Sequence, residues 1–112
     1  MRPDDVIRLR HMLDAASEAR EFVAYNSRND LDTDRKLTLS LVKSIEIIGE
    51  AASKVSDDTR KFSPSIPWQD ITAMRNRLIH AYFDINLDVV WDTVTEELPS
   101  LIDALKEALA GE

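Results

Sequence analysis

Apolar residues recur every three to four positions along nearly the whole chain, a spacing typical of the buried face of an α-helix. One such stripe covers residues 6–23 and a second covers residues 37–55, and the polar residues 26–32 between them predict a loop. The second helix is expected to begin near Asp32 or Thr33, because both side chains can cap a helix N-terminus. The first half of the chain thus predicts two helices.

The second half predicts two further helices after a break at residues 56–67, where Pro64 and Pro67 end the periodic pattern. A third helix is expected to begin at Pro67 or Trp68. Asn86 is the expected N-cap of a fourth helix, whose apolar stripe continues almost to the end of the chain.

Two details refine this picture of the helices. Pro99 lies inside the stripe of the fourth helix, and because proline has no N–H and clashes with the preceding turn, the helix should kink or restart there. Leu39, Val42 and Ile47 lie outside the main stripe of the second helix, which predicts that this helix is buried on more than one side. No segment alternates as a strand would. The fold is therefore predicted to be all-α, an up-down bundle of four main helices in one domain over residues 1–112.

The composition narrows the classes of protein to which the chain can belong. A length of 112 residues allows one domain with a substantial core. The absence of cysteine excludes a disulfide framework and a thiolate metal site, and it favours a reducing compartment. No apolar run approaches the roughly 18 residues of a membrane span, and the first residues lack the apolar core of a signal peptide. A soluble cytoplasmic protein that does not associate with membranes is expected.

The net charge of −7 is distributed very unevenly. Residues 1–83 carry 13 acidic and 13 basic side chains, whereas residues 84–112 carry eight acidic side chains and one basic side chain. An acidic total argues against nucleic-acid binding, but local positive potential in the neutral body can still serve a phosphate substrate. The acidic terminal segment is interpreted either as a solvated helix face or as a docking surface for a basic partner.

One segment, residues 74–84, contains side chains suited to phosphoryl chemistry. Arginine, here Arg75 and Arg77, presents a planar fork that matches phosphate oxygens, and His80 is suited to proton transfer near neutral pH. In a straight helix Arg75 and His80 would point about 140° away from each other. They converge only if the helix ends or distorts near His80, or if they come from different subunits. The alternative interpretation is a helix-capping histidine beside two surface arginines.

The order Arg75, four residues, His80, one residue, Tyr82 resembles the signature of the HepT toxins, a branch of the HEPN superfamily of all-α ribonucleases. Other segments also look typical of that family, and they follow in the expected order over most of the chain: IEIIGEAA at 45–52, IPWQDI at 66–71, YFDIN at 82–86, and the region from Trp91 to Pro99. The resemblance therefore implies a HEPN-like bundle.

The resemblance implies a metal-independent endoribonuclease without a cofactor. Arg75 and His80 would be its catalytic pair, and Asn76 would be a supporting polar residue. The 2′-OH of RNA would attack the adjacent phosphorus, with His80 as general base or acid and Arg75 stabilising the phosphoryl charge. DNA lacks this hydroxyl and should be inert. The chain has two histidines, no cysteine and scattered carboxylates, so its sequence shows no cluster of metal ligands.

The resemblance also implies partners. HEPN proteins typically form homodimers in which the two motifs face a shared cleft. HepT toxins belong to type VII-like toxin–antitoxin modules with an MNT-type nucleotidyltransferase antitoxin, which transfers AMP from ATP to the motif tyrosine, here Tyr82. The added phosphate charge and bulk would block RNA. Alternatively, Tyr82 closes the core with its hydroxyl at the rim.

Two other functions stay open on the sequence. In the first, the chain is a non-catalytic nucleotide- or partner-binding subunit of a nucleotidyltransferase, and Arg75 and His80 hold a nucleotide phosphate. In the second, the bundle only mediates assembly, so that alanine at both positions changes no activity. RNA cleavage is the measurement that separates them from the ribonuclease hypothesis.

Overall fold

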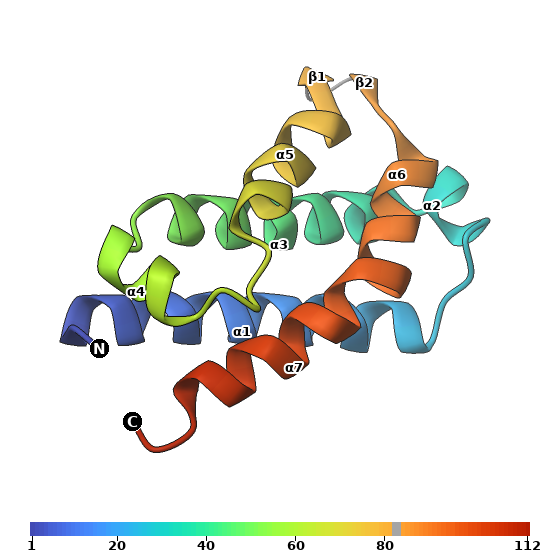
Figure 1. Ribbon diagram of the computed structural model, residues 1–112. Coiled ribbons are helices and arrows are strands. Elements are labelled where there is room, and N and C mark those ends of the chain that lie inside the picture. Colours follow the sequence, from blue (N-terminus) through green and yellow to red (C-terminus); the bar gives the residue numbers. More distant parts are fainter. Residues whose placement is uncertain (82–83) are drawn as a thin grey trace.

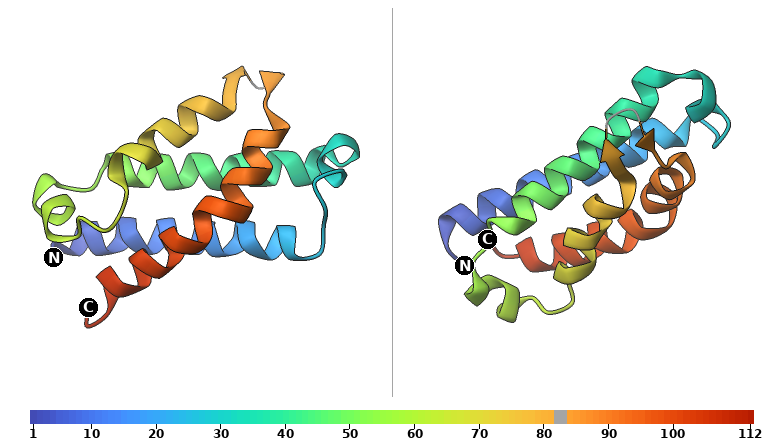
Figure 2. Two further views of the ribbon diagram at one scale, coloured as in Figure 1. Left: turned by 45° about the vertical axis from the view of Figure 1, so that its right-hand side comes forward. Right: turned by 90° about the horizontal axis from the view of Figure 1, so that it is seen from above.

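The computed structural model describes residues 1–81 and 84–112, which form a bundle of helices (Figure 1). Its elements, in chain order, are α1 (Pro3–Ala24), α2 (Asp30–Thr33), α3 (Arg35–Ser53), α4 (Asp57–Phe62), α5 (Trp68–Leu78), β1 (Ile79–Ala81), β2 (Asp84–Ile85), α6 (Leu87–Asp92), the π-helix η1 (Thr93–Glu97) and α7 (Leu98–Leu109). α1 and α3 lie side by side in opposite directions, α5 packs on α3, and α7 packs on α1 (Figures 1 and 2).

The main helical units are α1, α3, α5 and the continuous run from α6 through η1 to α7. This arrangement confirms the predicted all-α fold with four main helices. A short antiparallel pair of strands, β1 and β2, follows α5 and is the only sheet among the described residues. Within the same residues, no helix is both long and apolar enough to cross a membrane.

The apolar stripe predicted for the second helix forms the buried face of α3. Its buried members are Leu37, Leu41, Ile45, Ile48 and Ala52, and Val55, just beyond the end of α3, is buried as well. The prediction that this helix is buried on more than one side is wrong for two of its three residues: Val42 is buried, whereas Leu39 and Ile47 are 37% and 39% exposed. They line a shallow groove whose other residues come from α1 and α3, so no further element of the described chain lines this face.

Two segments predicted to be irregular each contain a short helix. α2 lies partly in the predicted loop 26–32, and α4 lies in the predicted break 56–67. Ser56 is the N-cap of α4, and its Oγ accepts a hydrogen bond from the Thr59 N–H at 3.4 Å. Helices of four and six residues contain too few positions to produce an apolar period, which explains why the pattern did not reveal them.

The start of α3 is set by a different residue from those predicted. Asp34 is the N-cap, and its Oδ1 accepts a hydrogen bond from the Leu37 N–H at 3.0 Å. Asp32 and Thr33 belong to α2 instead. The long helix therefore begins slightly later than the sequence indicates.

A buried carboxylate ties α1 to α4. Asp5, which is 3% exposed, accepts hydrogen bonds from the Ser56 N–H at 3.1 Å, the Ser56 hydroxyl at 2.6 Å and the Thr59 hydroxyl at 2.6 Å. Burial acts to raise the pKa of this carboxyl, but the hydrogen bonds from Ser56 and Thr59 together outweigh it and hold the pKa below its ordinary value. The ionised form of Asp5 is thus part of the folded structure.

Pro99 changes the last helix without breaking it. The Leu98 N–H bonds to the Thr93 carbonyl, which is the wider spacing of a π-helix. In that spacing the Val94 carbonyl would need the N–H of residue 99, which proline lacks. The Arg20 Nη1 donates to the Val94 carbonyl at 3.3 Å and so replaces the missing donor. The predicted irregularity at Pro99 is confirmed, and it takes the form of a π-helical turn just before the proline.

Candidate active site

The helix that carries the Arg75 motif is anchored firmly at its start. α5 begins at Trp68, as predicted, and the Trp68 Nε1 donates to the Ser63 carbonyl at 3.1 Å. The Arg60 guanidinium lies over the Trp68 ring, 5.4 Å from its centroid, and its Nη2 donates to the Ala52 carbonyl at 2.8 Å near the end of α3. Ile71 is fully buried against the core. These contacts hold the start of α5 in place and so set the direction in which the helix runs.

The end of α5 lies inside the motif. The helix stops at Leu78, so Arg75 belongs to its last turn, whereas His80 follows in β1. The backbone thus fulfils one of the two conditions under which these side chains can converge, since the helix ends before His80.

The strand pair places His80 at a break in register. Ile79 pairs with Ile85 and Ala81 pairs with Asp84, so His80 is an additional residue on β1 without a counterpart on β2. Such β-bulges bend a strand and redirect a side chain, and they occur often beside active sites. Asn86 follows β2 and caps α6 as predicted, with its Oδ1 accepting from the Val89 N–H at 3.1 Å. The motif is therefore held between two helix ends.

Several predicted site groups fall outside what the structure describes. Tyr82 lies outside the described residues, and so do the side chains of Arg75 and His80, whose backbones belong to α5 and β1. Asn76 is described and is exposed on α5. The described geometry therefore concerns the backbone of the predicted catalytic pair and the surroundings of the motif.

The acidic terminal segment folds back onto the rest of the chain. Arg77, the second motif arginine, pairs with Glu97 of η1 at 3.3 Å, and Asp88 of α6 accepts from the Arg28 Nε at 2.7 Å. Exposed pairs of this kind stabilise a fold by at most about 1 kcal/mol each. The interpretation of Arg77 as a surface residue agrees with this contact.

Among the described residues, no three His, Cys, Asp or Glu side chains gather closely enough to hold a metal ion.

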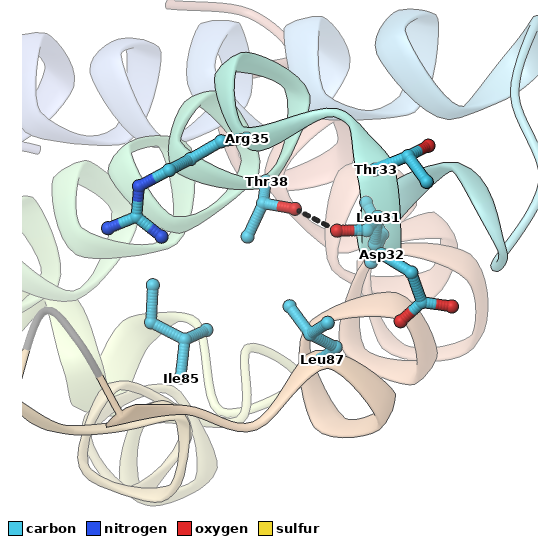
Figure 3. A pocket seen from close by; sticks show the side chains of 7 residues that line it. All are labelled: Leu31, Asp32, Thr33, Arg35, Thr38, Ile85 and Leu87. Atoms are coloured by element: carbon cyan, nitrogen blue, oxygen red, sulfur yellow. Dashed lines mark hydrogen bonds between the residues drawn. The ribbon is translucent and has the colours of Figure 1, made fainter.

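A cleft of about 260 Å³ opens next to the strand pair (Figure 3). One wall consists of Ile85 and Leu87, which follow the motif in sequence. The other wall comes from α2 and the start of α3, and its lining residues are Leu31, Asp32, Thr33, Arg35 and Thr38. Segments about fifty positions apart in the chain are thus brought together beside β2.

Arg35 does not stand out in the sequence pattern. Helical periodicity describes one helix at a time, so it does not indicate that the start of α3 faces the segment after β2. One signal was present nonetheless. After its N-cap Asp34, α3 begins with Arg35 and Lys36, although cations are unfavourable at the positive end of a helix dipole.

Comparisons with known proteins show the family of this chain. The model of the family described as "Ribonuclease HepT-like" matches residues 12–108. The protein named "Probable ribonuclease HepT" from Thermococcus cleftensis is 37% identical over 93 residues, which cover 83% of this chain and 84% of that protein. No solved structure matches the chain.

Two further relatives are similar over most of the chain. Both are named "Putative RNase". The one from Caldanaerobacter subterraneus is 38% identical over 104 residues, covering 93% of each chain. The one from Methanocaldococcus jannaschii is 31% identical over 90 residues, covering 80% of this chain and 83% of the relative. The residues matched by the family model include α5, β1 and β2, and the chain belongs to the HepT-like ribonuclease family.

Proposed function

We propose that this protein is a metal-independent endoribonuclease toxin that cuts RNA with the Arg75–His80 pair. The observation that supports this most directly is the end of α5 at Leu78, which allows His80 to leave the helix on a bulged strand immediately after the turn that carries Arg75. Membership of the HepT-like ribonuclease family supports the same activity. The proposal thus combines a local backbone arrangement with the family of the chain.

In the proposed reaction the 2′-oxygen of a ribose forms a bond to the adjacent phosphorus, and the bond from phosphorus to the 5′-oxygen breaks. His80 accepts the proton of the 2′-OH, and a proton is delivered to the leaving 5′-oxygen. Arg75 stabilises the charge that develops on the phosphoryl oxygens. Asn76, which is exposed in the same last turn of α5, supports the site by hydrogen bonding to the RNA backbone.

A homodimer completes this mechanism. Two proton transfers are needed, and a single histidine would have to serve both. Two copies of the chain facing each other across one cleft would supply two His80 and two Arg75 side chains. We propose that the active form is such a dimer, in which one His80 acts as the base and the other as the acid.

The purified protein is expected to cleave single-stranded RNA in EDTA and to leave 2′,3′-cyclic phosphate and 5′-hydroxyl ends. The 2′-OH is the nucleophile, so a 2′-deoxy substitution at the cleavage position should protect that bond. Gel electrophoresis with chemical analysis of the ends measures both results. Cleavage that needs added Mg²⁺, or that leaves 5′-phosphates, would contradict the mechanism. Tight AMP or ATP binding in calorimetry without RNA turnover would favour a nucleotidyltransferase subunit instead.

We further propose that an MNT-type nucleotidyltransferase antitoxin neutralises the enzyme by transferring AMP to Tyr82. In this reaction the phenolic oxygen attacks the α-phosphorus of ATP, and pyrophosphate leaves. The tyrosine is two positions from His80, so the added nucleotide would place negative charge and bulk beside the RNA-binding surface. The chain would then be the toxin of a type VII-like module.

Incubation with such a nucleotidyltransferase and ATP is expected to add AMP to the wild type, as intact mass spectrometry would record, and to abolish RNA cleavage. Tyr82→Phe should stay unmodified and active, because it lacks the attacking oxygen. Tyr25→Phe is the matched control, since Tyr25 is 93% exposed at the end of α1 and far from the motif in sequence. Modification that persists in Tyr82→Phe but disappears in Tyr25→Phe would refute the assignment.

A further inference from the structure

The cleft beside β2 lies next to the strand that carries His80. Ile85 lines this cleft and pairs with Ile79, the residue directly before His80. Paired strands lie about 4.8 Å apart, so the cleft begins roughly one strand away from the backbone of His80. A chain of nucleotides bound at His80 is therefore close enough to enter it.

Arg35 makes one end of this cleft positive. Its side chain is exposed and has no hydrogen-bond or ion-pair partner among the described residues. Asp32, the acidic residue of the lining, pairs with Arg28 at 3.2 Å and shares it with Asp88 at 2.7 Å, so its charge is partly offset. Figure 3 shows the Arg35 guanidinium on the same side as Ile85 and the Asp32 carboxylate on the opposite side. An anion that arrives from the strand pair thus meets an unpaired guanidinium first.

The position of Arg35 in its helix suggests a role other than stability. Arg35 is the first residue of α3, where the helix dipole disfavours a cation. The carboxylate of the N-cap Asp34 offsets the dipole here, but it accepts from the Leu37 N–H at 3.0 Å and forms no ion pair with Arg35. The Arg35 guanidinium therefore stays available to a ligand.

The rest of the cleft suits a nucleotide. Ile85 and Leu87 offer apolar surface, and Thr33 contributes an exposed hydroxyl group. The Thr38 hydroxyl donates to the Leu31 carbonyl at 3.1 Å, so its oxygen can still accept a hydrogen bond. A volume of about 260 Å³ is slightly smaller than the roughly 300–1,000 Å³ of pockets for drug-sized ligands. The cleft is therefore too small for more than one nucleotide.

We propose that this cleft binds the nucleotide adjacent to the cleaved one in single-stranded RNA, with Arg35 on its phosphate and Ile85 and Leu87 against its base. The inference rests on the proposed ribonuclease function. It extends the substrate site from the motif to the start of α3, and it makes Arg35 a substrate-binding residue. Because the phosphate contact is the same for every base, Arg35 contributes affinity and position, and not sequence preference.

The test measures the dissociation constant for a fluorescein-labelled single-stranded RNA by anisotropy, in the His80→Ala background so that the RNA stays intact. Adding Arg35→Gln should weaken binding roughly tenfold, the range of a hydrogen bond between charged groups, and should reduce the slope of log affinity against log salt by about 0.7. Arg10→Gln is the matched control, because Arg10 is also exposed and unpaired among the described residues but lies on α1 outside the cleft. It should leave the affinity unchanged.

Equal effects of the two substitutions, or no effect of Arg35→Gln, would overturn the proposal. So would a loss of affinity for the nucleotidyltransferase with unchanged affinity for RNA, since the cleft would then bind protein. With His80 present, Arg35→Gln should raise KM and leave kcat nearly unchanged. A wild-type protein that cuts no RNA contradicts the proposed function, whereas an active enzyme that is indifferent to Arg35→Gln contradicts only the cleft. The thermal midpoint of Arg35→Gln should equal or exceed that of the wild type, which separates a binding effect from misfolding.

Discussion

Replacing His80 by alanine should lower the rate of RNA cleavage by roughly 10²–10⁴-fold, the usual contribution of a general acid or base. His80 follows the end of α5 on a bulged strand, and Arg75 lies in the last turn of that helix. The rate should be measured in EDTA under single-turnover conditions, on protein whose helical circular dichroism matches the wild type. The loss should then appear in the cleavage step.

The matched control for this substitution is His11→Ala. His11 is the other histidine of the chain, and it is exposed on α1 away from the motif sequence. Its removal should leave the rate unchanged, which shows that the effect is specific to position 80. Cleavage that survives in His80→Ala, or that falls equally in both variants, would exclude His80 as the group that transfers the proton.

The helices could be predicted from the sequence wherever apolar residues recur with helical spacing over several turns. The stripe from Leu37 to Val55 predicted the buried face of α3 because burial of that face is a property of the helix itself. The exposure of Leu39 and Ile47 could not be predicted in the same way, since it depends on whether another element covers them. Short helices such as α4 depend on a single capping residue and on distant partners, which leave no period in the sequence.

The residues of the candidate site also differ in whether the local sequence or the tertiary packing brings them together. Arg75, His80 and Tyr82 were found because they lie within eight positions of one another and resemble a family motif. The end of α5 could be stated only as a condition, because helical spacing does not indicate where a helix stops. Arg35 was missed because its relation to Ile85 arises from tertiary packing. A local motif thus predicts the reacting residues, whereas tertiary packing determines which distant side chains lie beside them.

Asp5→Ala should lower the free energy of unfolding by about 3 kcal/mol, the largest stability effect that we expect from a single polar substitution. The change removes three hydrogen bonds to a charged acceptor and leaves the donors of Ser56 and Thr59 without it. Asp4→Ala is the matched control: Asp4 lies in the same first turn of α1 but is exposed, so only its interaction with the helix dipole is lost, about 0.3–1 kcal/mol. Urea denaturation measures both values.

The effect of Asp5 should also depend on pH in a defined direction. The pKa of Asp5 is lowered below its ordinary value of 3.8 in the folded state, so folding favours the ionised carboxylate. Its stabilisation is therefore fully present well above pH 3.8, and it disappears as the pH falls through the lower pKa of the folded protein. Asp5→Asn, which cannot ionise, should accordingly be less stable than the wild type at neutral pH and approach it in acid. The free energies of unfolding of the wild type and Asp5→Asn could instead differ by the same amount down to the lowest pH. The geometry of the hydrogen bonds, and not the charge of Asp5, would then stabilise the contact between α1 and α4.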